Sequence, residues 1–219
     1  MTLTIRKASE NDDAVIAAFG RKTFETAFGS ENDPDDMQSY LEDAFSEAQI
    51  ARELKTPGTT FLLAYNRSHL KKKVLVEVHG GPELQPAGIL QHSEELKQGA
   101  NTEIGPKNYC EIASNETLVG YAKLEKSLPP ACIRESNAME LGRLYVTAHH
   151  MGKGIGSQLI QACVDEASRQ GYKTVWLGVW KRNFRAQALY ERLGFVRVGT
   201  KTFVLGADVQ QDLVYAKPL

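Results

Sequence analysis

The fold is decided by the stretch His149-His150-Met151-Gly152-Lys153-Gly154-Ile155-Gly156-Ser157, which opens a segment with helical periodicity. Its three glycines occupy alternate positions. Glycine lacks a Cβ, so the backbone can approach a ligand closely, and the first amides of a helix have no intrahelical acceptor. The stretch therefore predicts a backbone site for the phosphate groups of a cofactor.

Two familiar phosphate-binding motifs do not fit this stretch. The dinucleotide-binding pattern G-x-G-x-x-G needs glycine or alanine where the chain has Ser157 or Leu159. The nucleotide-binding pattern needs serine or threonine after its lysine, whereas Lys153 is followed by Gly154. Taken alone, the stretch also fits a plain glycine-rich turn that leads into a helix.

The hydrophobic pattern on either side predicts an α/β fold with one central sheet. After the glycines, apolar residues recur every four positions along a helix over 154–170, and a nearly continuous apolar strand follows over 174–179. Further strands are expected at 3–7, 59–65, 118–124, 139–146, 195–198, 202–205 and 212–216, and further helices at 13–24, from 34 to 45 and at 186–193. Strands and helices that alternate in this way are typical of layered α/β domains.

Residues 67–116 interrupt this rhythm. They contain the run Lys71-Lys72-Lys73 and the turn-forming Gly80-Gly81-Pro82, with scattered glycine and proline elsewhere. A long segment of this kind is expected to be an excursion, part hairpin and part loop, between the second and third strands. The chain is therefore predicted to be a single domain, 1–219, with an insertion at 67–116.

Composition excludes several classes of protein. The net charge is −1, so nothing global indicates nucleic-acid binding. No segment approaches the ~18 consecutive apolar residues of a membrane span. Cys110, Cys132 and Cys163 lack the spacing of a disulfide framework or zinc site, and His149-His150 lacks ligand spacing, so no metal is expected. A reducing, cytoplasmic setting is the default expectation.

The charge is unevenly distributed along the chain. Residues 23–51 contain eight acidic side chains and neither lysine nor arginine, so they carry −8 and the remainder carries +7. Such a segment would attract a cationic substrate, while the positive remainder would suit an anionic cofactor. The alternative is that these acids only favour the N-terminal ends of two helices.

Several further strings resemble the GNAT N-acetyltransferase superfamily, and within it the PaiA-type polyamine N-acetyltransferases. They are Glu140-Leu141-Gly142-Arg143-Leu144-Tyr145-Val146, the three glycines, Trp176-Leu177-Gly178-Val179-Trp180, Asn183 and Ala188-Leu189-Tyr190-Glu191-Arg192-Leu193-Gly194-Phe195. The resemblance covers about 1–66 and 117–219. It implies a mixed central sheet with helices on both faces. One position departs from the family pattern, because Met151 stands where glutamine or arginine is usual.

The resemblance implies acetyl-CoA as cosubstrate. Backbone groups of the strand around Tyr145, at Leu144 and Val146, would pair with the pantetheine arm. The amides of Met151, Gly152, Lys153, Gly154, Ile155, Gly156 and Ser157 would hold the pyrophosphate. Asn183 would contact the cofactor where two central strands separate, and Tyr190 would lie near the thioester sulfur.

The implied chemistry assigns one role to each of three groups. An amine with a pKa near 10 must lose a proton before it attacks, and Glu140 would act as the base through water. The Val146 N–H would donate to the oxyanion, and Tyr190 would protonate the departing thiolate. The alternatives are that Tyr190 is only a core residue and that Glu140 is a structural partner of Arg143 or of a loop amide.

The acceptor implied by the resemblance is a small polyamine such as spermidine or spermine. Two alternatives stay open at this point: acetylation of a protein N-terminus or lysine, and a non-catalytic CoA-binding module. The expected partners are small molecules, with neither nucleic acid nor membrane among them. The sequence leaves a homodimer open.

Overall fold

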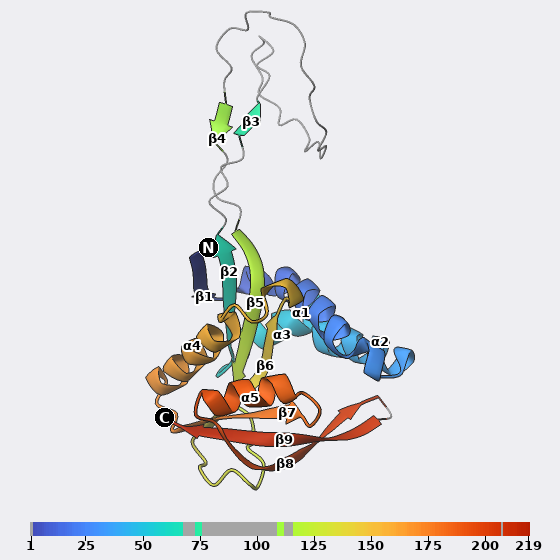
Figure 1. Ribbon diagram of the computed structural model, residues 1–219, viewed down its shortest axis with the longest axis vertical. Helices are drawn as coiled ribbons and strands as arrows, with labels where there is room; N and C mark the ends of the chain where they lie inside the picture. Colours follow the sequence, from blue (N-terminus) through green and yellow to red (C-terminus); the bar gives the residue numbers. More distant parts are fainter. Residues whose placement is uncertain (1, 68–72, 76–108, 112–115, 207) are drawn as a thin grey trace, which may run out of the picture. The chain divides into compact units, whose positions relative to one another are not determined.

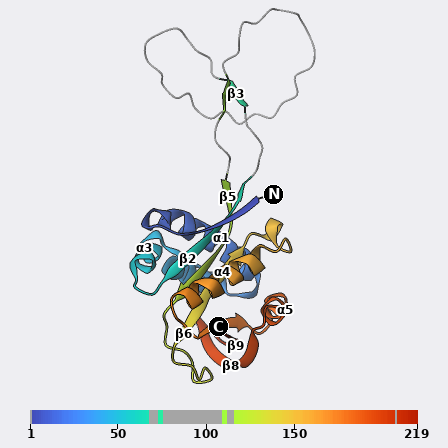
Figure 2. The same cartoon turned by 90° about the vertical axis from the view of Figure 1, so that its left-hand side faces the viewer.

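The computed structural model describes residues 2–67, 73–75, 109–111, 116–206 and 208–219. Their centre is a seven-stranded sheet in the order β1-β2-β5-β6-β7-β9-β8, with β1 and β8 at its edges (Figure 1), and Figure 2 shows the same sheet turned by 90°. All neighbouring strands are antiparallel except β6 and β7, so the predicted mixed sheet is confirmed. The strands are β1 Thr2–Lys7, β2 Thr60–Arg67, β5 Glu116–Glu125, β6 Ala138–Val146, β7 Thr174–Trp180, β8 Val196–Leu205 and β9 Asp208–Pro218.

Helices cover both faces of this sheet, as predicted (Figure 1). On β2, Leu62 packs in a cluster with α4 and α5, whereas its neighbours Phe61 and Leu63 pack with α1 and α3. Successive side chains of a strand point to opposite faces, which explains the alternation. The helices are α1 Asp13–Phe28, α2 Pro34–Phe45, α3 Glu47–Lys55, α4 Ile155–Arg169 and α5 Phe184–Arg192, with short 3-10 turns at Glu10–Asp12, Gly29–Glu31 and Ala148–His150.

Local capping explains where α2 and α3 begin. The Asp33 carboxylate accepts hydrogen bonds from the backbone N–H groups of Asp35 and Asp36, and Pro34 occupies the first helical position, as the sequence predicts. Helix α3 was absent from the sequence-based prediction. Its signal is the Ser46 hydroxyl, which accepts from the Gln49 N–H at 3.2 Å.

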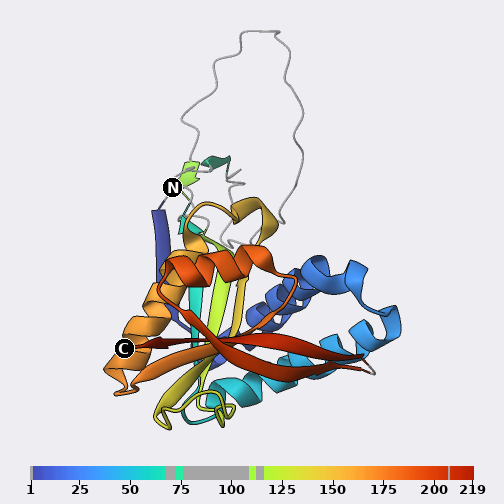
Figure 3. The same cartoon turned by 60° about the horizontal axis from the view of Figure 1, so that its bottom comes forward.

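The end of the chain differs from the prediction. Three closing strands were expected, but residues 196–205 form one strand, β8, which pairs along its length with β9 (Figure 3). The register shifts between Arg197 and Gly199, which indicates a local irregularity such as a bulge. The pairing with β9 continues on both sides of it.

The predicted excursion does separate the second and third strands of the central sheet, β2 and β5. Within it, β3 Lys73–Leu75 and β4 Tyr109–Glu111 pair antiparallel as a separate two-stranded sheet. By contacts, residues Ser68–Asn115 group as one unit and the rest of the chain as another. The remainder of the 67–116 prediction lies outside the described residues.

The largest buried cluster lies between the sheet and helices α4 and α5. Leu159 and Cys163 of α4 are fully buried in it, so the predicted apolar face of this helix is confirmed. Within the part of the chain that the structure describes, no helix is long and apolar enough to cross a membrane.

Glu166 ties α4 to the first strand. Its buried carboxylate accepts hydrogen bonds from Lys7 of β1 at 2.8 Å and from Arg169 at 2.6 Å. Burial opposes ionisation, but the bonds from Arg169, Lys7 and Gln170 prevail and hold the pKa of Glu166 at about 2. Because this value lies below the unfolded one, the carboxylate stabilises the fold above the unfolded pKa and loses that effect as pH falls toward the folded pKa.

Replacing Glu166 should therefore destabilise the protein in a pH-dependent way. Glu166→Gln is expected to lower the free energy of unfolding by about 2 kcal/mol near neutral pH. The difference from the wild type should shrink between about pH 5 and the folded pKa of about 2, as measured by urea denaturation. The control is Asp165→Asn, which removes the same negative charge at an exposed position of the same helix. A difference that stays constant with pH would contradict the assignment.

Candidate active site

A cavity of about 200 Å³ lies where β6 and β7 move apart. Aromatic side chains of α1 and α2 line one side, and charged side chains of β6, β8 and β9 line another. Helix α5 contributes from the opposite face of the sheet. The residues that line the cavity include Phe24, Phe28, Asn32, Tyr40, Glu140, Arg143, Leu144, Tyr145, Gly178, Asn183, Tyr190, Lys201 and Asp212.

The two central strands pair over only three residue pairs, from Ala138↔Thr174 to Glu140↔Trp176. Beyond Glu140, no described strand pairs with β6 on that side. On the other side, the Thr147 N–H donates to the Val119 carbonyl of the β5 segment at 3.0 Å. Hydrogen-bonding groups alternate in direction along an antiparallel strand, so those of Leu144 and Val146 point away from β5. They form an open strand edge, and Leu144 of this edge lines the cavity.

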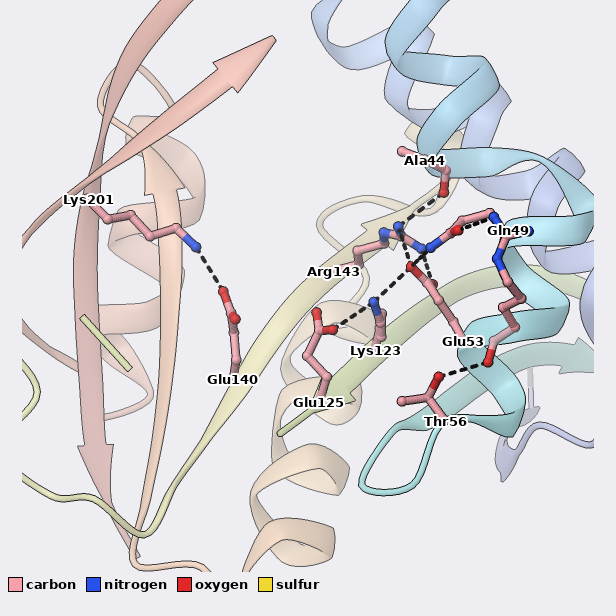
Figure 4. Close-up of polar contacts among 10 residues, drawn as sticks. Ala44, Gln49, Glu53, Thr56, Lys123, Glu125, Glu140, Arg143 and Lys201 are labelled. Atoms are coloured by element: carbon pink, nitrogen blue, oxygen red, sulfur yellow. Dashed lines mark hydrogen bonds and ion pairs between the residues drawn. The ribbon is translucent and has the colours of Figure 1, made fainter. Parts of the chain in front are cut away.

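A bulge and a buried ionic cluster accompany this separation. Gly142 is an extra residue on β6 opposite β5, and such a bulge bends its strand. The next residue, Arg143, donates to both carboxylate oxygens of Glu53 on α3, at 2.8 and 3.1 Å (Figure 4). Lys123 contacts the same carboxylate at 3.0 Å. These contacts hold the part of β6 around Arg143 against α3 and away from β7.

The cluster is electrically balanced. Burial opposes ionisation of Glu53, yet the positive charges of Arg143 and Lys123 hold its pKa below the ordinary value. The Lys123 ammonium also contacts Glu125 at 2.9 Å, and the Arg143 guanidinium lies 4.8 Å from the Phe45 ring centroid. Two cations and two carboxylates neutralise one another, so this cluster adds no net charge to the cavity.

The glycine stretch has the backbone that its sequence predicts. Gly152 and Gly154 have φ values of 79° and 80°, which favour glycine, and Gly154 is the N-cap of α4 with no side-chain capping bond. The first intrahelical donor is the Gln158 N–H, which bonds to the Gly154 carbonyl at 3.1 Å. The amides of residues 155–157 therefore lack intrahelical acceptors and suit an anion.

Gly156 and Met151 differ from the other residues of the stretch. A Cβ at Gly156 would lie 3.4 Å from the Leu189 side chain of α5, an ordinary van der Waals contact, so packing does not require glycine at this position. The Met151 N–H already donates to the Ala148 carbonyl at 3.2 Å, and its side chain is 43% exposed. The free donors therefore begin after Met151.

Asn183 and Tyr190 come from the two ends of α5. Asn183 is the N-cap, and its side-chain oxygen accepts from the Ala186 N–H at 3.1 Å. Tyr190 is buried, with Phe195 and Tyr215 as ring neighbours at 5.9 and 6.3 Å, and it also lines the cavity. Burial raises the pKa of Tyr190 above the ordinary tyrosine value. Tyr190 can therefore be a core residue and a cavity-lining residue at once. Its phenol is protonated at neutral pH.

Glu140 has a different partner from the one considered in the sequence. The expected alternative was Arg143, which instead pairs with Glu53. The Lys201 ammonium of β8 donates to Glu140 at 2.8 Å, on the other side of β6 in Figure 4. Sequence patterns could not show this contact, because its two residues are 61 positions apart.

Asp212 is a cavity residue to which the sequence assigned no role. It lies on β9, opposite Trp180 of β7 and Lys201 of β8, and is only 9% exposed. Burial raises its pKa, while the positive charge of Lys201 opposes the rise. The available signal was an acid directly before the apolar run Leu213-Val214-Tyr215-Ala216.

The acidic segment 23–51 contributes apolar groups to the cavity. Phe24, Phe28 and Tyr40 line it, together with Asn32, but none of the eight carboxylates does. The helices turn their apolar stripes inward, which leaves the acids at the surface or half-buried. Negative charge inside the cavity comes from Glu140 and Asp212 instead.

Comparisons with known proteins identify relatives of this chain. Residues 82–195 match the model of the acetyltransferase (GNAT) family. An uncharacterised N-acetyltransferase of Lactobacillus delbrueckii subsp. lactis is 27% identical over 215 residues, 98% of this chain and 96% of that protein. N-acetylaspartate synthetase of Danio rerio is 40% identical over 80 residues, 36% of this chain and 28% of that protein.

The fold also matches solved structures. The PaiA N-acetyltransferase of Thermoplasma acidophilum, crystallised in complex with coenzyme A, superposes with a TM-score of 0.63. The alignment covers all of both chains at 16% identity, so it shows a shared fold.

Proposed function

This chain belongs to the GNAT acetyltransferase family, and we propose that it transfers the acetyl group of acetyl-CoA to a primary amine of a small polyamine. The amine would attack directly, in a complex that holds both substrates. One observation carries this proposal: the cavity places two acidic side chains, Glu140 and Asp212, beside the open edge of β6.

The residues at the cavity fit acetyl-CoA. The open backbone at Leu144 and Val146, on either side of Tyr145, offers the hydrogen bonds of an added strand to the pantetheine amides. Gly152, the amides up to Ser157 and the exposed Lys153 offer donors and charge to the pyrophosphate. Asn183 lines the same cavity and would contact the pantetheine arm. When bound, the cofactor supplies an acetyl thioester that is activated toward amines.

The side chains divide the proton transfers between them. An acceptor amine is an ammonium at neutral pH, so Glu140 would take its proton, directly or through water. The Val146 N–H, which points outward from the open edge, would donate to the acetyl oxygen. Tyr190 stays protonated because it is buried, so its hydroxyl can deliver a proton to the thiolate as it leaves.

The cavity suits a cationic alkyl chain. Glu140 and Asp212 carry two negative charges against one positive charge on Lys201, while the charge of Arg143 is balanced by Glu53. The aromatic rings contributed by α1 and α2 supply an apolar surface for methylene groups. These features support a polyamine acceptor.

An amino-acid acceptor is the second candidate, because one observation favours it. The Lys201 ammonium lies in the cavity and could bind a carboxylate, and a partial relative is named for N-acetylaspartate. Protein N-termini or lysines, and a CoA-binding role without catalysis, are the remaining alternatives.

We place the protein in the cytoplasm, since the thiols of Cys132 and Cys163 are free.

A direct assay of CoA release decides among these acceptors. Spermidine and spermine are expected to give the highest kcat/KM, compared with aspartate, a lysine peptide and a peptide with a free N-terminus. The protein should first be shown to bind acetyl-CoA by calorimetry. Binding without CoA release from either polyamine would contradict the proposed acceptor, and absence of binding would contradict acetyl transfer itself.

Tyr190→Phe tests the proton donor. Loss of the hydroxyl should reduce kcat by about 100-fold, with the Kd for acetyl-CoA unchanged, because the phenol acts only as the thiolate leaves. Tyr172→Phe is the matched control, since Tyr172 packs against the same core but does not line the cavity. An unchanged kcat in the Tyr190→Phe variant would show that Tyr190 only packs in the core and does not donate the proton.

Gly154→Ala tests the pyrophosphate site. Alanine at φ 80° is strained by about 1 kcal/mol, and the methyl group also narrows the approach to the loop, so the Kd for CoA should rise about tenfold. Gly171→Ala carries the same strain, at φ 86°, beyond the other end of α4, with nothing within 4 Å of the added methyl. Equal CoA affinity in the two variants, measured by calorimetry, would exclude the loop from cofactor binding.

A further inference from the structure

Lys201 takes a defined path into the cavity. It stands opposite Asp212 in the β8–β9 ladder. Its side chain crosses Gly178 so closely that a Cβ there would lie 2.6 Å from the Lys201 Cε. The ammonium then lies 5.0 Å from the Trp176 ring centroid and donates to Glu140 at 2.8 Å (Figure 4). An unbranched alkyl chain ending in a primary ammonium therefore already lies in the cavity.

Asp212 has hydrogen-bonding capacity that the described residues do not use. Its Oδ1 atom is buried and has no hydrogen-bond partner among the described residues. A buried carboxylate oxygen without a donor is costly, and few are left so in folded proteins. Asp212 lines the cavity, so a ligand that enters the cavity can supply the missing donor.

The groups around the Lys201 ammonium match one class of ligand. A primary ammonium has three N–H donors and no acceptor, so it can serve two carboxylates at once. The face of an indole ring attracts the same charge. Glu140 and Asp212 line the cavity. The buried Trp176 ring is not part of the cavity lining, but it faces the Lys201 ammonium where that ammonium meets Glu140.

We propose that Glu140, Asp212 and Trp176 form a binding site for the primary ammonium of the acceptor, and that Lys201 is an internal occupant which the acceptor displaces. This inference rests on the proposed amine acetylation. The Lys201 side chain is 28% exposed, so it has a route to solvent. Its departure would free Glu140 for the incoming amine and leave the Asp212 oxygen for a second N–H donor.

Removal of the internal ammonium should create a site for a small external one. Lys201→Ala is expected to bind n-propylammonium chloride with an affinity at least about tenfold above that of the wild type, measured by calorimetry without acetyl-CoA. Tetramethylammonium, which has no N–H donor, and sodium chloride at equal ionic strength should not reproduce the gain. Lys201→Met, which keeps most of the stem, serves if the alanine variant does not fold.

Two further variants identify the residues that are responsible for the gain in propylammonium affinity. Lys201→Ala combined with Asp212→Asn should lose the gain in propylammonium affinity. Lys217→Ala should show none, because the Lys217 ammonium lies over the Phe195 ring and donates to the Leu193 carbonyl outside the cavity.

Two outcomes would overturn the inference. A folded Lys201→Ala variant that binds propylammonium no better than the wild type would leave Lys201 a structural counter-ion. Loss of aspartate binding in that variant, without a gain for propylammonium, would make Lys201 a carboxylate-binding residue. Neither outcome depends on acetyl-CoA, so failure here is distinct from failure of the CoA-release assay.

Discussion

The short pairing between β6 and β7 is the constraint on which the rest of the site depends. Three residue pairs join the strands, and β6 then follows β5 alone. The bulge at Gly142 and the buried contact between Arg143 and Glu53 hold β6 on the α3 side. A buried ion pair gives little net stability, but loss of one partner is costly, so the pair is well suited to fix the direction of a strand.

This separation brings together groups from both faces of the sheet. Tyr190 belongs to the core on the α4 and α5 side, whereas Glu140, Lys201 and Asp212 belong to the side that α1 and α2 cover. A continuous sheet would keep the two sets apart. Where the strands part, a proton donor from one side and a carboxylate from the other line the same cavity, as a transfer between two substrates requires.

Local patterns in the sequence predicted much of the fold but less of the site. The N-cap Asp33, the apolar face of α4 and the glycines before it follow from neighbouring residues, so they could be predicted. Helix α3 was missed because its apolar pattern is short, and β8 was divided at a bulge. The partners of Glu140 and Arg143 lie 61 and 90 positions away along the chain, and no local periodicity reports such contacts.

Hydrogen exchange of the β6 amides, with and without CoA, tests the central claim most directly, because the open edge is where the cofactor should add its hydrogen bonds. At CoA concentrations that saturate binding in calorimetry, peptides that contain Leu144 and Val146, and those that span residues 152–157, should exchange at least about tenfold more slowly. Peptides from β1 should be unaffected. Saturated binding with unchanged exchange along β6 would contradict the claim that its open edge holds the cofactor.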